Sequence, residues 1–331
     1  MTPAELARQV RLLELSTRRR VTEVFAGEYS SAFKGRGMEF SEVREYQPGD
    51  DVRFIDWNVT ARSGRPFIKR FVEERELTVM LVVDLSGSFE FGTAPGGARA
   101  GAGGVGRGAG GEWSVLSDGS KRAIAAKVGA LLAFAAVRSG DRVGLCAFTD
   151  RIEHYVPPRK GSRHALRLVR ELLAVEPVGR GTNLAPVADR LRRVLHRRSL
   201  VFVVSDFVPG NQSNLKAFES SLRRLGRAGN GGGGRGGHDI IAAVVRDRRD
   251  AELVSAGLIR VRDPETGREA VIDTSSRSVR EAYAQAFRKA DRELDQALLG
   301  AGLRGGRSRV DLWTHEQPVH SLVELFHRRE R

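Results

Sequence analysis

Residues 77–88 read LTVMLVVDLSGS, an apolar run that ends in an aspartate followed by two serines. A run without alternating polar residues is typical of a strand buried on both faces of a parallel sheet. Similar runs occur in DRVGLCAFTD (141–150) and SLVFVVSD (199–206), and segments with helical periodicity lie between the runs. Strands that alternate with helices predict an α/β fold with a doubly wound, mostly parallel sheet.

The rest of the chain is organised around this sheet. Two glycine-rich stretches are expected to be flexible insertions, because neither carries the GxxxxGK[ST] pattern of a phosphate-binding loop. Short aromatic and β-branched runs, broken by glycine and proline, predict a small β-rich appendage before the sheet. The predicted parts are an N-terminal helix (1–19), the β-rich segment (20–75), the sheet domain (76–316) with insertions at 92–119 and 226–237, and a C-terminal helical tail (317–331).

The composition is that of a globular protein, with 40% hydrophobic and 29% charged residues in a chain of 331. No stretch approaches the roughly 18–20 apolar residues that cross a bilayer, and the first residues lack the apolar core of a signal peptide. We therefore expect no membrane span and a cytoplasmic location. The single cysteine, Cys146, agrees with that location because one thiol cannot form an internal disulfide.

The net charge of +14 raises the question of nucleic-acid binding. The basic residues are nevertheless spread along the chain, often beside acidic ones, and the densest clusters have no aromatic residues interleaved for base stacking. We expect no nucleic-acid partner, and an acidic protein partner suits the charge better.

Oxygen-bearing residues that can bind a metal follow the buried runs. Asp84, Ser86 and Ser88 follow the run at 77–83, Asp206 ends the run at 199–206, and Thr182 lies in a loop before a helix. Ligands of a doubly wound sheet bind beyond the carboxyl ends of its strands, so Asp84 and Asp206 should meet if their strands are neighbours. Two carboxylates and three hydroxyls suit Mg²⁺, with Mn²⁺ or Ca²⁺ as alternatives, and the lack of His and Cys argues against zinc.

The same residues allow other interpretations. Ser88, Thr182 and Asn183 could simply cap helices, which would leave a metal-free structural scaffold. Asp84 could also be the nucleophile of a Mg²⁺-dependent phosphatase, but Ser86 stands where such enzymes carry a second aspartate as general acid. Hydroxyls leave a bound cation under-neutralised, so the ion would favour a carboxylate donated by a partner. The leading prediction is therefore a non-enzymatic, metal-dependent protein-interaction module.

The pattern resembles the metal-ion-dependent adhesion site of the von Willebrand factor A family. That site has D-x-S-x-S on one loop, a threonine on a second and an aspartate on a third, matched here by Asp84, Ser86, Ser88, Thr182 and Asp206. The resemblance implies a von Willebrand factor A-like domain with a Rossmann-type strand order. It also implies that the serines and the threonine bind the ion directly, and that the aspartates act partly through water.

A second resemblance covers roughly residues 20 to 250. The strings GRGMEF (35–40), REY (44–46), GDDVR (49–53) and IDW (55–57) are similar to the signature of the bacterial domain-of-unknown-function 58 family, which precedes a von Willebrand factor A-like domain. Members of that family are commonly associated with MoxR-type AAA+ ATPases. The resemblance therefore implies an adaptor that works with such an ATPase in the assembly or maturation of protein complexes.

Overall fold

The computed structural model describes residues 3–20, 23–33, 38–73, 76–90, 119–208, 212–228 and 237–330. The predicted insertion at 92–119 lies almost entirely outside these residues, as does most of the one at 226–237 and the GRG part of the signature at 35–37. Within the described part of the chain, no helix is long and apolar enough to cross a membrane.

The centre of the molecule is a six-stranded sheet with the order β10-β7-β6-β3-β4-β5. Each neighbouring pair is parallel except β4 and β5, which are antiparallel. This confirms the α/β prediction with a mostly parallel sheet. The strands are β3 (Thr78–Asp84), β4 (Arg142–Phe148), β5 (Ile152–Arg159), β6 (Leu200–Ser205), β7 (Asp239–Arg246) and β10 (Arg309–Trp313).

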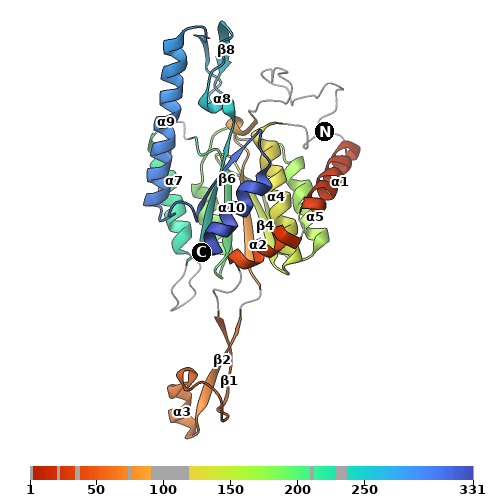
Figure 1. Ribbon diagram of the computed structural model, residues 1–331, viewed down its shortest axis with the longest axis vertical. Helices are drawn as coiled ribbons and strands as arrows, with labels where there is room; N and C mark the ends of the chain where they lie inside the picture. Colours follow the sequence, from red (N-terminus) through yellow and green to blue (C-terminus); the bar gives the residue numbers. More distant parts are fainter. Residues whose placement is uncertain are drawn as a thin grey trace.

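Helices cover both faces of the sheet (Figure 1). Alternate residues of β3 point to opposite faces, so that Leu81 joins one hydrophobic core and Val82 the other. The first core includes α4 (Lys121–Arg138), α5 (Ser162–Ala174) and α10 (Pro318–Glu330), and the second includes α6 (Ala185–Val194), α7 (Gln212–Arg227) and α9 (Arg277–Gly300).

Two N-terminal helices form an outer layer over the first core. The first, α1 (Pro3–Arg20), packs on α4 and α5, whereas α2 (Glu23–Phe33) packs on α10 and α4. The prediction that all of 20–75 is β-rich is therefore wrong for its first part. Phe25, Tyr29 and Phe33 recur every four residues, so they share one face of a helix, where they meet one another and Phe326.

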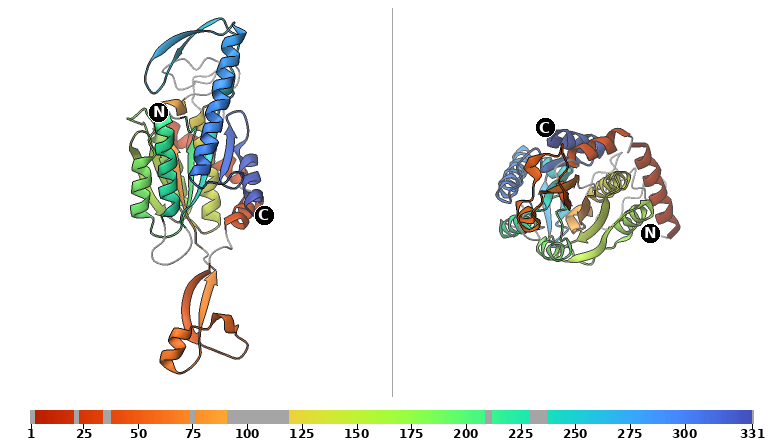
Figure 2. Two further views of the ribbon diagram at one scale, coloured as in Figure 1. Left: turned by 90° about the vertical axis from the view of Figure 1, so that its left-hand side faces the viewer. Right: turned by 90° about the horizontal axis from the view of Figure 1, so that it is seen from below.

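The remainder of that segment forms a separate appendage. Strands β1 (Met38–Glu45) and β2 (Phe67–Glu73) pair antiparallel, and the connection between them holds η1 (Val52–Phe54) and the short helix α3 (Trp57–Ser63), which was not predicted. The Asp56 carboxylate caps α3 by accepting hydrogen bonds from two backbone amides. The appendage projects from the end of the sheet at which β3 begins (Figures 1 and 2).

A second projection lies at the opposite end of the sheet. It consists of the one-turn helix α8 (Arg248–Ala251) and the antiparallel hairpin of β8 (Leu258–Arg262) and β9 (Glu269–Asp273). The left view of Figure 2 shows the hairpin leaving the top of α9 and arching across the end of the sheet. The sequence did not predict these elements, because both strands are short and largely exposed.

Candidate functional site

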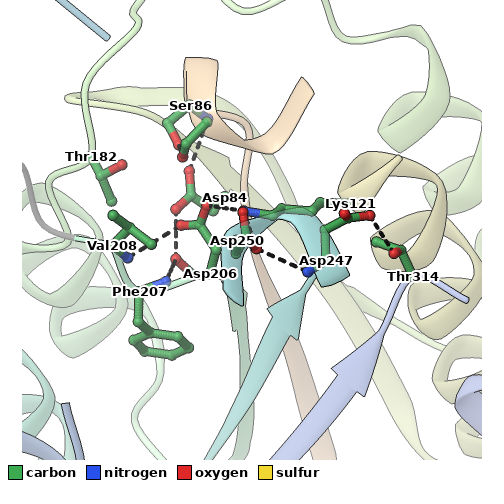
Figure 3. Close-up of polar contacts among 12 residues, drawn as sticks. Asp84, Ser86, Lys121, Thr182, Asp206, Phe207, Val208, Asp247, Asp250 and Thr314 are labelled. Atoms are coloured by element: carbon green, nitrogen blue, oxygen red, sulfur yellow. Dashed lines mark hydrogen bonds and ion pairs between the residues drawn. The ribbon is translucent and has the colours of Figure 1, made fainter. Parts of the chain in front are cut away.

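The candidate site lies where β3 and β6 end. The two strands are parallel neighbours, with Val83 opposite Val204. Asp84 and Asp206 therefore leave the sheet side by side, as predicted, and Figure 3 shows their side chains facing the same space. A switch in crossover direction places ligands at this kind of position in α/β sheets.

Asp84 is fully buried, and both of its carboxylate oxygens accept hydrogen bonds. The Ser86 amide donates to Oδ1 at 2.8 Å, and the Ser205 hydroxyl donates to Oδ2 at 2.6 Å. Burial raises the pKa of Asp84 to about 7, and the negative charge of Asp206 contributes to the rise. The surroundings of Asp84 therefore compensate its negative charge poorly.

The two serines of the loop stand next to each other. The Ser86 and Ser88 hydroxyl oxygens are 3.1 Å apart, with Ser86 buried and Ser88 half-buried. The loop that contains them is tied to the loop before α6, because the Gly87 amide donates to the Arg180 carbonyl at 2.9 Å. The first two loops of the predicted site are therefore held together by backbone contacts.

Thr182 lies in that second loop, as the sequence predicted, and its side chain is half-buried. Leu184 is the N-cap of α6 and makes no side-chain capping bond, but the Asn183 side chain, one residue earlier, accepts a hydrogen bond from the Ala185 amide at 3.0 Å. The Thr182 hydroxyl instead donates to the Glu265 carboxylate at 3.1 Å. Glu265 comes from the turn of the β8–β9 hairpin and was not predicted as a site residue.

Burial also raises the pKa of Glu265, and the Asp206 charge contributes to the increase. The Glu265 carboxylate on the hairpin is therefore close enough to Asp206 for the two negative charges to repel each other.

Asp206 has a cationic partner that sequence reasoning missed. The Lys121 ammonium lies 2.9 Å from Asp206 and 3.0 Å from Asp250, and only 2% of its side chain is exposed (Figure 3). Lys121 is the first residue of α4, directly after the capping Ser120. The available signal was a lysine at the start of a helix whose following residues are almost all apolar.

Further polar contacts extend away from Lys121. Asp250 accepts a hydrogen bond from the Asp247 amide at 2.9 Å, and Asp247 accepts one from the Thr314 hydroxyl at 2.5 Å. The loops after β7 and β10 are thereby connected to the site (Figure 3).

The chain turns sharply after Asp206. Phe207 has a φ of 52°, in the left-handed region that residues other than glycine rarely adopt. Its amide donates to the Ser205 hydroxyl at 3.0 Å, and its ring packs edge-on against Phe218. The Val208 amide then donates to Asp206 Oδ1 at 3.3 Å, so the turn places the next backbone amide against this carboxylate (Figure 3).

Comparison with known proteins places this chain in a family. The model of the family described as "Protein of unknown function DUF58" matches residues 42–103 and 114–293. The chain belongs to the DUF58 family. It is 30% identical over 302 residues to uncharacterized proteins of Mycobacterium tuberculosis and Mycobacterium bovis, covering 90% of this chain and 83% of each relative.

Solved structures give weaker likenesses to this DUF58 chain. The conserved hypothetical protein BatB from Bacteroides thetaiotaomicron has a TM-score of 0.35 at 12% identity, covering 67% of this chain and 99% of that one. An aerotolerance-related membrane protein from Bacteroides fragilis has a TM-score of 0.38 at 14% identity, covering 77% and 98%.

The residues of this DUF58 site fit a hard divalent cation better than a soft one. In the described part of the chain, no three His, Cys, Asp or Glu side chains are grouped closely enough to hold a metal. A cation here would depend on hydroxyl oxygens and water as well as on carboxylates, which is the shell that Mg²⁺ accepts. Asp84 and Asp206 are both buried, and each would gain a compensating positive charge from a cation beside it.

Proposed function

We propose that the protein is a non-enzymatic, divalent-metal-dependent protein-interaction module. The observation that carries the proposal is the meeting of Asp84 and Asp206 at the ends of adjacent strands, beside the paired hydroxyls of Ser86 and Ser88. Thr182 completes the set of five predicted ligands. These residue types, on three loops, match the von Willebrand factor A-type metal site that the sequence resembles.

The balance of charge supports a cation. Asp84, Asp206 and Asp250 lie in one polar cluster, and Lys121 is the cation that contacts two of them. One ammonium cannot neutralise three carboxylates. Buried carboxylates without compensation are unfavourable, so a divalent ion beside Asp84 would stabilise the site. When bound, the ion supplies a Lewis-acidic position for an oxygen ligand from a partner.

The proposed partner is a MoxR-type AAA+ ATPase, for which the protein would serve as an adaptor in the cytoplasm during assembly or maturation of protein complexes. The support for this partner is the family to which the chain belongs and the resemblance described above. A carboxylate on the partner is the group that a metal held by hydroxyls would accept.

The environment of Asp84 supports a role without catalysis. Both of its oxygens already accept hydrogen bonds, and the side chain is fully buried. A phosphatase with an aspartyl nucleophile also needs a general acid, whereas the residue at that position is Ser86. Phosphatase activity on p-nitrophenyl phosphate that disappears in Asp84→Asn would overturn this part of the proposal.

Metal binding is tested with Mn²⁺, which can be titrated against the full chain by electron paramagnetic resonance. We expect the wild type to bind Mn²⁺, and the Asp84→Ala, Asp206→Ala double variant to lose that binding. Ser86→Ala should reduce Mn²⁺ binding less than the double variant does. Ser278→Ala, at an exposed position on α9, is the matched control for Ser86→Ala. Equal Mn²⁺ affinity in the wild type and the double variant would exclude the proposed site.

The partner is tested separately by co-purification with the ATPase in Mg²⁺ and in EDTA. We expect recovery of the ATPase with the wild type in Mg²⁺, and a strong reduction with EDTA or in the Asp84→Ala variant. An ATPase that is recovered equally under all conditions binds elsewhere on the protein. No recovery under any condition counts against the partner.

Lys121 favours one alternative, a metal-free scaffold. Its ammonium already contacts Asp206, which is one of the predicted metal-binding residues. In that case the lysine would replace the cation, and neither Mg²⁺ nor Mn²⁺ would change the stability of the protein. A thermal unfolding midpoint that is the same in EDTA and in excess Mg²⁺ is the result that this alternative requires.

A further inference from the structure

The turn of the β8–β9 hairpin lies directly against the metal loop. A Cβ atom placed on Gly87 would stand 2.6 Å from the Pro264 carbonyl oxygen and 3.3 Å from the Pro264 Cβ. Only a residue without a side chain allows this approach. The backbone of the hairpin turn therefore rests on the glycine between the two serines of the site.

The next residue of the turn reaches the site with its side chain. Glu265 is half-buried, and its carboxylate accepts the hydrogen bond that Thr182 donates at 3.1 Å. Thr182 is one of the proposed ligands, so an ion held by Thr182 would find a carboxylate beside it. This contact joins residues that are 83 positions apart in the chain.

The turn also holds Glu265 in place. The Asp263 carboxylate accepts hydrogen bonds from the amides of Glu265 at 2.9 Å and Thr266 at 3.2 Å, and from the Thr266 hydroxyl at 2.6 Å. The Asp263 amide donates to the Arg268 carbonyl at 2.8 Å, which closes the end of the hairpin. A carboxylate on a preorganised turn loses less entropy when it binds than one on a free segment.

We propose that Glu265 is a carboxylate ligand which the chain supplies to its own metal, so that the hairpin fills the place where a partner's carboxylate would bind. This inference rests on the proposed function and names the regulation of that site. A metal held by neutral hydroxyls favours an anionic ligand, and Glu265 is the carboxylate that contacts the Thr182 hydroxyl. A partner's carboxylate must then replace Glu265, and the hairpin must move away from Gly87.

The test compares Glu265→Gln with Glu269→Gln in the full chain. Glutamine keeps the size of the side chain but removes its charge, and Glu269 lies exposed on the same hairpin. We expect the Mn²⁺ affinity of Glu265→Gln to fall by a factor on the order of ten or more, because the loss of a direct ligand should weaken binding at least as much as the loss of an outer-shell partner. Glu269→Gln should bind Mn²⁺ as the wild type does.

Added acetate can supply the carboxylate that Glu265→Gln lacks. We expect acetate to strengthen Mn²⁺ binding by Glu265→Gln and to have little effect on the wild type, whose carboxylate position is already filled. Hydrogen exchange at residues 263–268 gives an independent readout. Mn²⁺ should slow this exchange in the wild type and in Glu269→Gln, and leave it unchanged in Glu265→Gln.

The possible results separate the two proposals. Mn²⁺ binding that is equal in the wild type and Glu265→Gln, while Asp84→Ala with Asp206→Ala abolishes it, would overturn the role of Glu265 and leave the metal site intact. Weaker Mn²⁺ binding by Glu265→Gln without the acetate effect would also overturn the ligand role. A wild type that binds no Mn²⁺ would overturn both proposals.

Discussion

Asp84 should make the metal-free protein less stable as the pH rises, which is the opposite of the usual effect of a carboxylate. Its pKa rises from an ordinary value of 3.8 to about 7 in the folded chain, so the folded state binds more protons than the unfolded state between these values. Stability of the metal-free protein should therefore fall as pH rises from about 4 to about 7, by an amount on the order of a few kcal/mol from this residue. Above that range the loss from this residue is complete.

Urea unfolding in EDTA at pH 5 and at pH 8 measures the effect. We expect Asp84→Asn to lose less stability between the two pH values than the wild type, because asparagine does not ionise. Asp189→Asn, on the surface helix α6, is the control and should behave as the wild type. Parallel changes in the wild type and Asp84→Asn would show that Asp84 does not titrate in this range.

Lys121 is a buried cation whose loss should destabilise the metal-free fold. Lys121→Met leaves Asp206 and Asp250 without the ammonium that now contacts both. Removal of one member of a buried ion pair typically destabilises a protein by about 3–5 kcal/mol. We expect a loss of this order in urea unfolding in EDTA, and a partial recovery in Mg²⁺ as the ion compensates the carboxylates.

The matched control for Lys121 is Lys160→Met. Lys160 pairs with Glu76 on the surface, where an ion pair is screened by solvent, and we expect little change in unfolding. If Lys121→Met unfolds at the same urea concentration as this control, the buried ion pairs do not stabilise the protein.

The predictability of the site differs between its residues. Asp84, Ser86, Ser88, Thr182 and Asp206 follow predicted elements, so their placement could be inferred from the order of the strands. Lys121 and Glu265 could not be found in this way. Their roles depend on the packing of a helix terminus and of a hairpin turn, neither of which leaves a periodic pattern in the sequence.

At the scale of elements, the long buried strands were predictable and the helix α2 was not. Continuous apolar runs identify β3, β4, β6 and β7, because each is buried on both faces. The aromatic residues Phe25, Tyr29 and Phe33 favour strands by type, but their spacing of four places them on one face of a helix. In this segment, packing against α10 decides the structure over intrinsic preference.

Substitution of Tyr29 tests how much the attachment of α2 contributes to the free energy of unfolding. Its buried hydroxyl donates to the Asp141 carboxylate at 3.0 Å, and Asp141 also accepts from the Leu77 amide directly before β3. We expect Tyr29→Phe to lower the free energy of unfolding by about 1–3 kcal/mol, because the buried Asp141 carboxylate loses one of its hydrogen-bond donors. Tyr46→Phe, in the appendage, is the control. An unchanged urea midpoint in Tyr29→Phe would mean that this bond does not stabilise the fold.

Gly87 is the residue at which the hairpin and the metal loop touch. In Gly87→Ala the new methyl group would meet the Pro264 backbone oxygen at 2.6 Å, so the hairpin turn has to shift. We expect faster hydrogen exchange at residues 263–268 in this variant. Gly181→Ala is the control, because its Cβ would have nothing closer than 3.8 Å. Equal exchange in the two variants would show that the turn does not rest on Gly87.

At the scale of the whole molecule, the appendage and the candidate site lie at opposite ends of the sheet (Figure 1). Met38 pairs with Glu73, so the chain enters and leaves the appendage at adjacent points. Strand β1 pairs with β2 along its length, and β2 also contacts η1 and α3. A short linker should therefore be able to replace residues 38–73 without disturbing the remaining fold.

We expect the protein without residues 38–73 to unfold cooperatively and to bind Mn²⁺ with the affinity of the full chain. Near-ultraviolet circular dichroism and Mn²⁺ titration measure the two properties. The appendage presents Trp57, which is 70% exposed, and Phe54 to the solvent. A shortened protein that binds Mn²⁺ normally but no longer retains the ATPase would assign the partner contact to the appendage. Loss of Mn²⁺ binding would contradict the independence of the two ends.

The hydrogen bond between Thr314 and Asp247 has a consequence for the synthesis of the protein. The contacts around the site begin with Asp84 in the first strand of the sheet and end with Thr314, after the last strand. Chains emerge from the ribosome from the N-terminus at about 5–20 residues per second. The ends of β3 and β6 can meet early, but the bond between Thr314 and Asp247 must wait for β10. The polar contacts beyond Lys121 are thus completed only when almost the whole chain has been made.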